Sequence, residues 1–478
     1  MSVALTRMTT AMGALGRPAV RLAPLSGDGT SMVPWVVGGG CVLLLGSLAF
    51  FIDPKLGLAA LGLPAVPFLV LHPAHALLAF IAAMPFDAVA SLLPDRTLTL
   101  TRLLGVGVLG CWIVHVLVRR ERVRLTLSGL LLAGYVAYAA ASYFWADNPE
   151  ATARQLQTIA QLFLLYVMTA NLVASAAAME RALNVLVAAT ALLGFFVLWQ
   201  MPSGGPDTRA TLQYGEQHFD PNFLAATLAI TAVAAAVLGR ARGALGWWRI
   251  AALLPMLGAI AATGSRGGAV AFVAGIGILA LARPRLGLRA AGFLILVGLA
   301  LPLVLPPTML DHFVERFTLS GEDRLSGRLD IWKVALMMIG DRPLQGTGFA
   351  CFRDAFYHYM ATAGVDPTWA LQNSYGGRVA HNVYLGTFAE LGFVGLGLLV
   401  GGFVFHGLGL YRTWRGAAAV GDQRLANMAL AMLCVLVSFM VCGNNIDLML
   451  LKSTWVMLGL IQGVILIGER TGLGALRR

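Results

Sequence analysis

The sequence predicts an all-α polytopic membrane protein, a bundle of helices with one large polar loop, and three observations support this. Of the 478 residues, 58% are hydrophobic and only 12% are charged, and the mean hydropathy is +0.77. A soluble globular protein has about 25% charged residues, so this chain cannot cover its surface with polar groups in water. Apolar runs long enough to cross a bilayer recur along the chain, and basic residues gather between alternate runs.

Fourteen apolar runs approach the length of about 20 residues that a membrane helix needs. The second and third runs contain Pro64, Pro67, Pro73 and Pro85, so they can instead form a broken or re-entrant pair, which leaves twelve full spans. The runs lie near residues 33–52, 56–71, 74–93, 100–118, 126–144, 154–172, 181–200, 220–238, 247–263, 268–282, 289–306, 383–411, 424–442 and 450–468.

The basic residues predict the orientation of the chain. If the N-terminus is cytoplasmic and the runs alternate, the cytoplasmic segments hold 20 of the 34 basic residues and five of the 23 acidic ones. This is the positive-inside asymmetry of membrane proteins, and it places both termini in the cytoplasm. The net charge of +11 therefore reflects topology, and no basic stripe with interleaved aromatic residues indicates nucleic-acid binding.

These assignments divide the chain into five parts. Residues 1–32 form a cytoplasmic segment, 33–306 hold eleven membrane helices, 307–382 form a large outer loop, 383–468 hold three more helices, and 469–478 form a cytoplasmic tail. No signal-peptide pattern precedes the first run, so we expect it to remain as an uncleaved anchor. The five cysteines share neither metal-ligand spacing nor a loop, so we expect neither a disulfide framework nor a metal site.

The outer loop is predicted to carry short helices of its own. In SGRLDIWKVALMMIGDRP, a 3–4–3 spacing predicts an amphipathic helix that ends at Pro343 and lays its apolar side on the bilayer or the bundle. A second short helix is expected around 350–360. We interpret the DRPLQGTGF turn between them as a structural turn that redirects the chain from one loop helix to the next. The predicted apolar side consists of Leu329, Trp332, Leu336 and Ile339.

Two arginine positions are candidates for binding an anion at the outer face. Arg266 lies in the short turn GSRGG between two spans, where its glycines permit positive φ and leave backbone amides accessible. An outer arginine opposes the positive-inside rule, which favours a functional reading over a simple interface anchor. Arg328, preceded by Arg324, opens the amphipathic helix, where the helix dipole also favours an anion. For Arg328 and Arg324, a solvated loop arginine is the alternative.

Polar residues also stand at the start of two spans. In EQHFDPNF, Asp220 and Pro221 predict an N-cap and first helical residue. Asp220 is also a candidate for substrate contact, and His218 is either such a candidate or a solvated side chain. His381 and Asn382 end the large loop. Asn382 is expected to cap the next helix and is a further candidate for substrate contact, and a neutral His381 beside it could serve as a general base. Glu390 lies in an apolar stretch and needs a polar partner there.

Six motifs, in this order, resemble the family of O-antigen ligases and polysaccharide polymerases, the Wzy/WaaL group. The resemblance covers roughly residues 130–470. The motifs are WADNPEATARQL, DPNFLA, GSRGGAVAF, GRLDIWKVALMMIGDRPLQGTGF, AHNVYLGTFAELGFVGLG and NIDLMLLKSTWVMLGL.

The resemblance implies a fold of the GT-C type with 12–14 membrane helices and glycan transfer at the periplasmic face of the bacterial inner membrane. The donor it implies is a glycan on undecaprenyl diphosphate, and the acceptor is a sugar on a lipid-linked repeat unit or on lipid A–core. It implies no metal and no cofactor. A chain-length regulator and a flippase are candidate partners, beside membrane lipid.

The residues and the resemblance together predict the roles. Arg266 and Arg328 clamp the diphosphate, since without a metal the leaving-group charge needs guanidinium groups. His381 activates or orients the acceptor hydroxyl. Exopolysaccharide or O-antigen polymerase and O-antigen ligase both fit these motifs, with a slight preference for polymerase. A lipid-linked glycan flippase or transporter would instead need charged residues at mid-membrane depth and paired broken helices.

Overall fold

The computed structural model describes residues 72–87, 99–200, 209–214, 217–218, 220–239, 243–304, 327–366 and 378–472. All of them belong to the compact unit Leu69–Arg478. Within these residues the fold is helical, apart from one antiparallel pair, β1 (Gln213–Tyr214) and β2 (Gln217–His218). The predicted all-α fold is thus confirmed. The predicted spans 33–52 and 56–71 lie outside the described residues.

The helices begin and end close to the predicted apolar runs. Their bounds are α5 (Pro73–Ala83), η2 (Met84–Phe86), α6 (Leu100–Arg119), α7 (Leu127–Ala141), η3 (Ser142–Phe144), α8 (Pro149–Leu172), α9 (Ala176–Trp199), α10 (Pro221–Leu238), α11 (Ala244–Ala251), α12 (Leu253–Ala262), α13 (Arg266–Ala282), α14 (Pro284–Val304), α16 (Arg328–Asp341), α17 (Phe352–Met360), α19 (Val383–Ala419), α20 (Gln423–Cys442) and α21 (Lys452–Arg470).

Seven helical stretches in the described part are long and apolar enough to cross a membrane. They are Thr101–Arg119, Leu127–Phe144, Ala176–Trp199, Pro221–Leu238, Ala244–Ala262, Val383–Ala419 and Gln423–Cys442. Two shorter apolar helices, Pro73–Phe86 and Arg266–Ala282, accompany them. This confirms a polytopic membrane protein.

Side-chain oxygens start many of these helices. Asn148 accepts a hydrogen bond from the amide of Ala151 at 3.1 Å, and Ser265 accepts one from Gly268 at 3.4 Å. Each cap satisfies an amide that the first helical turn leaves without a partner. The other side-chain caps in the described part are Thr99, Ser175, Asp220, Asn382 and Asp422.

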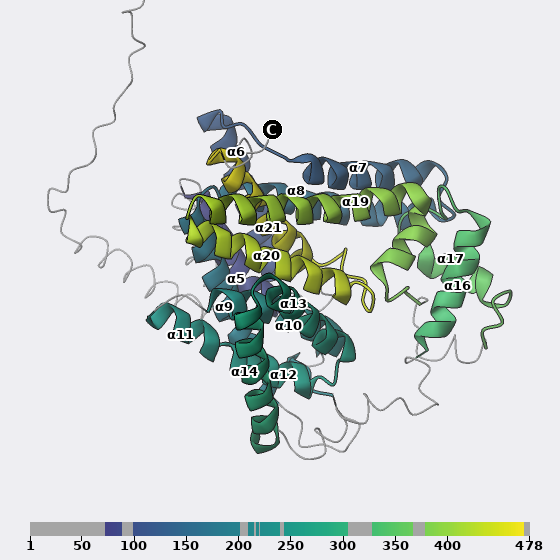
Figure 1. The fold of residues 1–478 in the computed structure, drawn as a ribbon. Helices are drawn as coiled ribbons and strands as arrows, with labels where there is room; N and C mark the ends of the chain where they lie inside the picture. The colour runs from purple at the N-terminus through teal and green to yellow at the C-terminus, as the bar shows by residue number, and fades with distance from the viewer. Residues whose placement is uncertain are drawn as a thin grey trace, which may run out of the picture. The chain divides into compact units, whose positions relative to one another are not determined.

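The long helices pack side by side through small residues. In Figure 1, α7, α8 and α19 run alongside one another, and α20 packs against both α13 and α19. A Cβ on Gly275 of α13 would lie 2.7 Å from Val233 of α10, and one on Gly459 of α21 would lie 2.7 Å from Thr169 of α8. Within a membrane the hydrophobic effect does not drive helices together. Close approach of their backbones at small residues instead gives them favourable van der Waals packing.

A buried polar network adds to this packing. The Tyr166 hydroxyl on α8 donates to Gln462 Oε1 on α21 at 3.1 Å and lies 3.2 Å from Nε2 of His406 on α19. Thr126 and Ser128, at the start of α7, also donate to Gln462. Four helices therefore share one hydrogen-bonded cluster, which satisfies polar groups that lipid could not.

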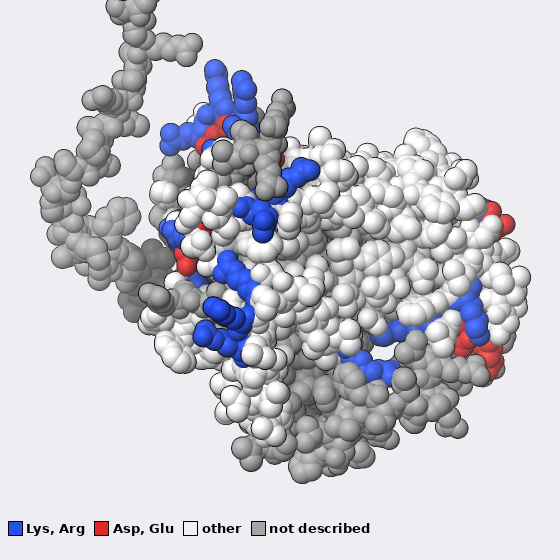
Figure 2. Space-filling view, viewed as in Figure 1, with Lys and Arg blue, Asp and Glu red and all other residues white. Residues whose placement is uncertain are grey.

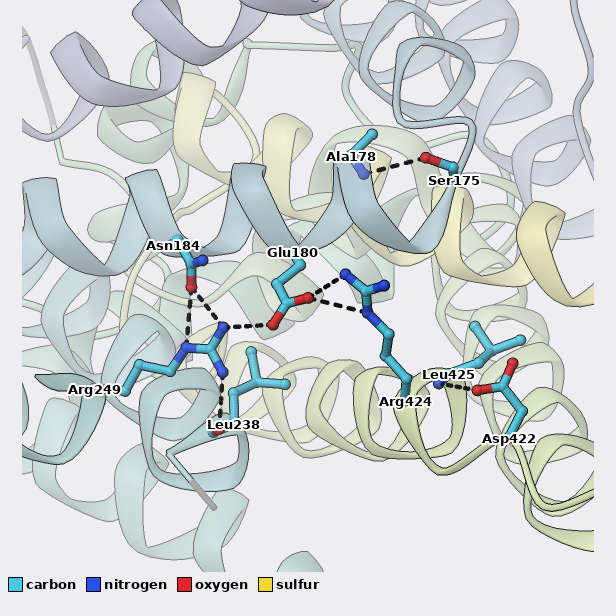
Figure 3. A network of polar contacts seen from close by, with 9 residues as sticks. All are labelled: Ser175, Ala178, Glu180, Asn184, Leu238, Arg249, Asp422, Arg424 and Leu425. Carbon is cyan, nitrogen blue, oxygen red and sulfur yellow. Dashed lines mark hydrogen bonds and ion pairs between the residues drawn. The ribbon is translucent and has the colours of Figure 1, made fainter. Parts of the chain in front are cut away.

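Residues that the sequence assigns to the cytoplasmic side gather at one end of the bundle. Glu180 of α9 lies between Arg249 of α11 and Arg424 of α20 (Figure 3). Arg249 is fully buried and also donates to Asn184 and to the carbonyl of Leu238. In Figure 2, Lys and Arg gather at two ends of the face shown, with an uncharged band between them. An uncharged band between charged ends is the pattern expected of a bundle that crosses a membrane.

The loop helices α16 and α17 form a small core of their own against the start of α19. The residues of α16 that face this core are Ile331, Val334, Ala335 and Met338. The predicted helix is confirmed, and its apolar side is confirmed in part: Trp332 and Ile339 pack against this core, whereas Leu329 and Leu336 are exposed. Because α16 has apolar residues all round, a 3–4–3 spacing fits more than one face of it. The second loop helix is confirmed as α17.

The loop between α16 and α17 pairs with a break in α19. Gly392 has φ 62° and ψ −164°, which interrupts the helix. The amides of Thr347 and Gly348 donate to the carbonyls of Ala389 and Glu390 at 3.0 and 2.8 Å. A Cβ on Gly392 would lie 2.2 Å from the backbone of Leu344. The DRPLQGTGF turn is therefore structural, as predicted, and it fixes the outer end of α19.

The same loop is fastened to the start of α8. Arg342 forms an ion pair with Asp147 at 2.6 Å, and the amide of Asp147 donates to the carbonyl of Thr347 at 2.9 Å. The indole of Trp145 donates to the carbonyl of Gln345 at 3.1 Å. The WADNPE motif thus acts as an anchor for the outer loop.

Candidate functional site

His381 stands in a strained backbone position immediately before α19. Its φ is 48°, in the left-handed region that few residues other than glycine adopt. The backbone is held on both sides. The indole of Trp332 in α16 donates to the carbonyl of Ala380 at 3.1 Å, and the amide of Val383 donates to the carbonyl of Gly443 at 2.7 Å. Such strain persists only where surrounding contacts determine the conformation, which is typical of functional sites.

Asn382 caps α19, as the sequence predicts. Its Oδ1 accepts hydrogen bonds from the amides of Tyr384 at 2.9 Å and Leu385 at 3.0 Å. The cap fixes where the helix begins and therefore where His381 lies relative to it.

The surroundings of His381 favour a neutral imidazole. Burial lowers the pKa of His381, and the positive charges of Arg328 and Arg378 lower it further, while Asp220 opposes them. The neutral form of His381 that the sequence analysis considered is therefore favoured, and burial is the main cause. A neutral imidazole is the form that can accept a proton.

Arg328 and the turn that carries Arg266 meet at a single amide. Arg328 Nη1 donates to Oδ1 of Asn445 at 3.4 Å, and a Cβ on Gly267 would lie 3.0 Å from Cβ of Asn445. Gly327 stands at the N-cap of α16, and no side chain in the described part caps that end. The structure thus brings both predicted arginine positions to the α20–α21 loop.

The glycines of the GSRGG turn serve two purposes. Gly264 has φ 60°, as the predicted turn requires. Gly267 and Gly268 instead allow close packing, since a Cβ on Gly268 would lie 2.7 Å from Ala225. The amide of Gly268 is bound by Ser265. The expectation of freely accessible amides is therefore wrong for Gly268, and an anion here would depend on the Arg266 side chain.

Asp220 caps α10, with its carboxylate accepting from the amides of Asn222 at 2.7 Å and Phe223 at 3.3 Å. Asn222 in turn accepts from Arg209 Nη2 at 2.9 Å and from Ser265 Oγ at 3.3 Å. Arg209, which sequence reasoning missed, therefore ties the DPN motif to the GSRGG turn. His218 lies in β2, and its side chain is outside the described part. Arg324 lies outside the described residues.

A cavity of about 490 Å³, lined by polar and apolar side chains, borders the segment just before His381. We call it the chamber. Residues 379–380 line it, so it reaches the backbone beside the histidine. It is also lined by Tyr135 of α7; Arg154, Gln155 and Thr158 of α8; Phe352 and Arg353 of α17; Thr387 and Glu390 of α19; and Asp447, Met449 and Leu450 of the α20–α21 loop.

Three carboxylates, those of Asp354, Glu390 and Asp447, line the chamber. Glu390 accepts a hydrogen bond from the amide of Phe352 at 3.0 Å, at the start of α17, which is the polar partner that the sequence required. Asp447 lies in the α20–α21 loop, and burial raises the pKa of this carboxyl. Sequence reasoning missed the chamber because its residues come from five separate segments. The WADNPE and NIDLML motifs were the available signals.

Residues 251–400 match the O-antigen ligase family, Wzy_C, which confirms the resemblance seen in the motifs. No curated protein matches the chain. A solved structure described as "Structural coordination of polymerization and crosslinking by a peptidoglycan synthase complex" has a chain that aligns at 19% identity. The alignment covers 70% of this chain and 96% of that one, with a TM-score of 0.37.

The matched segment contains Arg266, Arg328 and His381. The family match indicates a membrane glycosyltransferase of the ligase or polymerase type. The GT-C-type arrangement implied by the resemblance stays a prediction.

Proposed function

We propose that the protein transfers a glycan from undecaprenyl diphosphate to an acceptor sugar at the periplasmic face of the bacterial inner membrane. The observation that carries this proposal is the position of His381 at the end of the outer loop, where Trp332 of α16, the helix that begins with Arg328, holds the carbonyl of Ala380. A base next to fixed positive charge is what displacement of a diphosphate by a hydroxyl requires.

In this proposal Arg328 and Arg266 bind the diphosphate of the donor. As the glycosidic C–O bond breaks, negative charge grows on the leaving phosphate. A guanidinium keeps its charge at any pH and can bind phosphate through two hydrogen bonds. The N-terminus of α16 adds backbone amides and a positive dipole end at Arg328. Asn445 would orient Arg328 through their shared hydrogen bond. The residues present supply this charge without a metal or cofactor.

His381 takes the proton from the acceptor hydroxyl as that oxygen attacks the anomeric carbon. The lowered pKa of His381 keeps the ring neutral before reaction. Attack from the side opposite the diphosphate inverts the anomeric centre. Identical anomeric configuration in donor and product would contradict this geometry.

The test uses purified protein with a glycan-linked undecaprenyl diphosphate donor. We expect His381→Ala to abolish product, whereas His358→Ala, an exposed histidine of α17, should keep full activity. Both variants should show the unfolding temperature of the parent protein. Full activity of a well-folded His381→Ala variant would remove the base role.

Polymerase is the form of this activity that we favour, and ligase is the second candidate because the matched family is described by that activity. The same assay separates them when lipid-linked repeat units and lipid A–core are offered as competing acceptors. Longer glycans on the polyprenyl carrier indicate a polymerase, and glycosylated lipid A–core indicates a ligase. A chain-length regulator or flippase would be a partner of the polymerase form. A flippase would show neither product.

A further inference from the structure

A second cavity, of about 280 Å³, adjoins the chamber and lies mainly between α6 and α8. We call it the slot. Thr158 of α8 and Leu450 of the α20–α21 loop line both the chamber and the slot, so the two spaces meet at these residues. Neither the family match nor the proposed mechanism assigns a role to the slot.

The slot follows α8 away from the chamber. The chamber is lined by α8 residues from Ala151 to Thr158, and the slot by α8 residues from Thr158 to Met168. At 1.5 Å per residue, those last ten residues span roughly 15 Å along the helix. By the predicted topology, α8 starts at the outer face. The slot therefore runs from the outer polar region toward the middle of the membrane.

The lining of the slot changes from polar to apolar along this path. At its upper end, Lys452 Nζ forms an ion pair with Asp87 at 2.8 Å and donates to Thr101 at 2.7 Å. Arg102 lines the same end. Deeper residues are apolar, including Leu109 of α6 and Leu165 of α8. A space graded in this way suits an amphiphile, with its hydrocarbon tail in the apolar part and charged groups near the cations.

The chamber suits the other half of such a ligand. Amide, hydroxyl, carboxylate and guanidinium groups line it together with the aromatic Tyr135 and Phe352. Pockets of this mixed kind orient a polar ligand through a few hydrogen bonds. The chamber reaches Ala380, the neighbour of His381. A saccharide in the chamber would therefore approach the proposed base.

We propose that the chamber and the slot form one binding site for the acceptor, a saccharide carried on a single isoprenyl chain. The saccharide lies in the chamber, the phosphate linkage lies near Arg102 and Lys452, and the first part of the chain lies in the slot. A volume of about 280 Å³ matches a stretch of one hydrocarbon chain and not the several chains of a multi-acyl glycolipid. This inference rests on the proposed glycosyl transfer and assigns it an acceptor.

The loop between α20 and α21 separates this site from the donor side. Asn445 contacts Arg328 and the Arg266 turn, Asp447 lines the chamber, and Leu450 lines both chamber and slot. The proposed donor and acceptor places thus lie along one loop, and Ala380, which lines the chamber, directly precedes His381 in the chain. An enzyme that joins two lipid-linked glycans needs such a separation.

Photocrosslinking tests the slot without any turnover. The full chain, in phosphatidylcholine vesicles, receives an isoprenyl diphosphate that carries a diazirine in its chain. We expect labelled peptides from α6, within Thr101–Leu109, and from α8, within Thr158–Met168. Labelling confined to α10 and α13 would overturn the proposal. A diazirine-bearing phosphatidylglycerol is the second probe, and equal slot labelling by it would also overturn the proposal.

Two glycines of α6 provide a matched pair of variants. Gly105 lines the slot, and a Cβ there would lie 3.2 Å from the ring of Phe80, whereas nothing lies within 4 Å of a Cβ on Gly107. Gly105→Leu should fill the slot and lower labelling about tenfold, the effect of losing about 1.4 kcal/mol of tail binding. Gly107→Leu should label like the parent protein. Equal labelling of the two variants would contradict the proposal.

Val106→Trp gives the same test if Gly105→Leu proves unstable, because Val106 lines the slot and is 62% exposed. In the transfer assay, the filled slot should raise the KM for the lipid-linked acceptor and leave the KM for the donor unchanged. If the parent protein is labelled in the slot but transfers no glycan, the proposed function is refuted and the binding site in the slot stands. If a variant with a filled slot transfers glycan with the acceptor KM of the parent protein, the acceptor site in the slot is refuted and the proposed function stands.

Discussion

The indole of Trp332 donates a hydrogen bond to the carbonyl of Ala380 at 3.1 Å, which ties the loop helix α16 to the residue before His381. The same helix begins with Arg328, which lowers the pKa of that histidine. One short helix therefore positions the proposed base and also adds to the effect of burial, which favours the neutral imidazole.

Trp332→Phe should lower kcat about fivefold and leave KM for the donor nearly unchanged. Loss of one hydrogen bond costs about 1 kcal/mol, and the misplaced base then spends less time in reactive geometry. Trp145→Phe is the matched control, since its indole also donates to a loop carbonyl at 3.1 Å but at the start of α8. Equal losses of kcat in both variants would show a general effect on stability instead of positioning of His381.

The pH dependence should report the charges around His381. Its pKa is lowered, so the neutral base persists below the usual range of histidine, and activity falls only as pH drops through that lowered value. Arg378→Gln removes a charge that lowers the pKa, so the acidic limb should move to higher pH. Asp220→Asn removes a charge that raises the pKa, so the limb should move to lower pH, while Asn still caps α10. If the pH profiles of kcat/KM for Arg378→Gln and Asp220→Asn shift in the same direction, His381 is not the group that titrates in the acidic limb.

Gly392→Ala should destabilise the protein by about 3 kcal/mol or more, because its φ and ψ belong to a region that is essentially restricted to glycine. The added Cβ would also lie 2.2 Å from the Leu344 backbone. Gly340→Ala in α16, where nothing lies within 4 Å, should be neutral or slightly stabilising. Thermal unfolding in detergent measures both, and similar unfolding temperatures would refute the role of the break.

Chelation of divalent metal ions should leave the transfer rate unchanged if guanidinium groups alone stabilise the leaving diphosphate. The assay is repeated after dialysis against EDTA, and then with Mg²⁺ or Mn²⁺ restored. A rate that falls on dialysis and recovers with metal would show that Arg266 and Arg328 do not suffice.

Features with local causes could be predicted from the sequence. Asn382 and Asp220 cap their helices because a short polar side chain before an apolar run satisfies the first amides. The positions of α6, α13, α19 and α20 follow from apolar length alone. These features depend on residues within a few positions of one another.

Features that depend on tertiary contacts could not be predicted from the sequence. The inward face of α16 is set by α17 and α19, not by spacing, so Leu329 was assigned wrongly. Arg209 and Asn445 are polar loop residues whose partners lie on other segments. The positive φ of His381 has no sequence signal, since it results from contacts made by Trp332 and Gly443.

The break at Gly392 has a consequence for engineering this protein. The first turns of α19 are bonded to the outer loop through Ala389 and Glu390, and Val383 also donates to Gly443 in the α20–α21 loop. A graft of the outer loop between related enzymes should therefore be joined after Gly392 and not before Val383. The transplanted piece would then carry the histidine, its cap and the Trp332 that holds Ala380 as a unit.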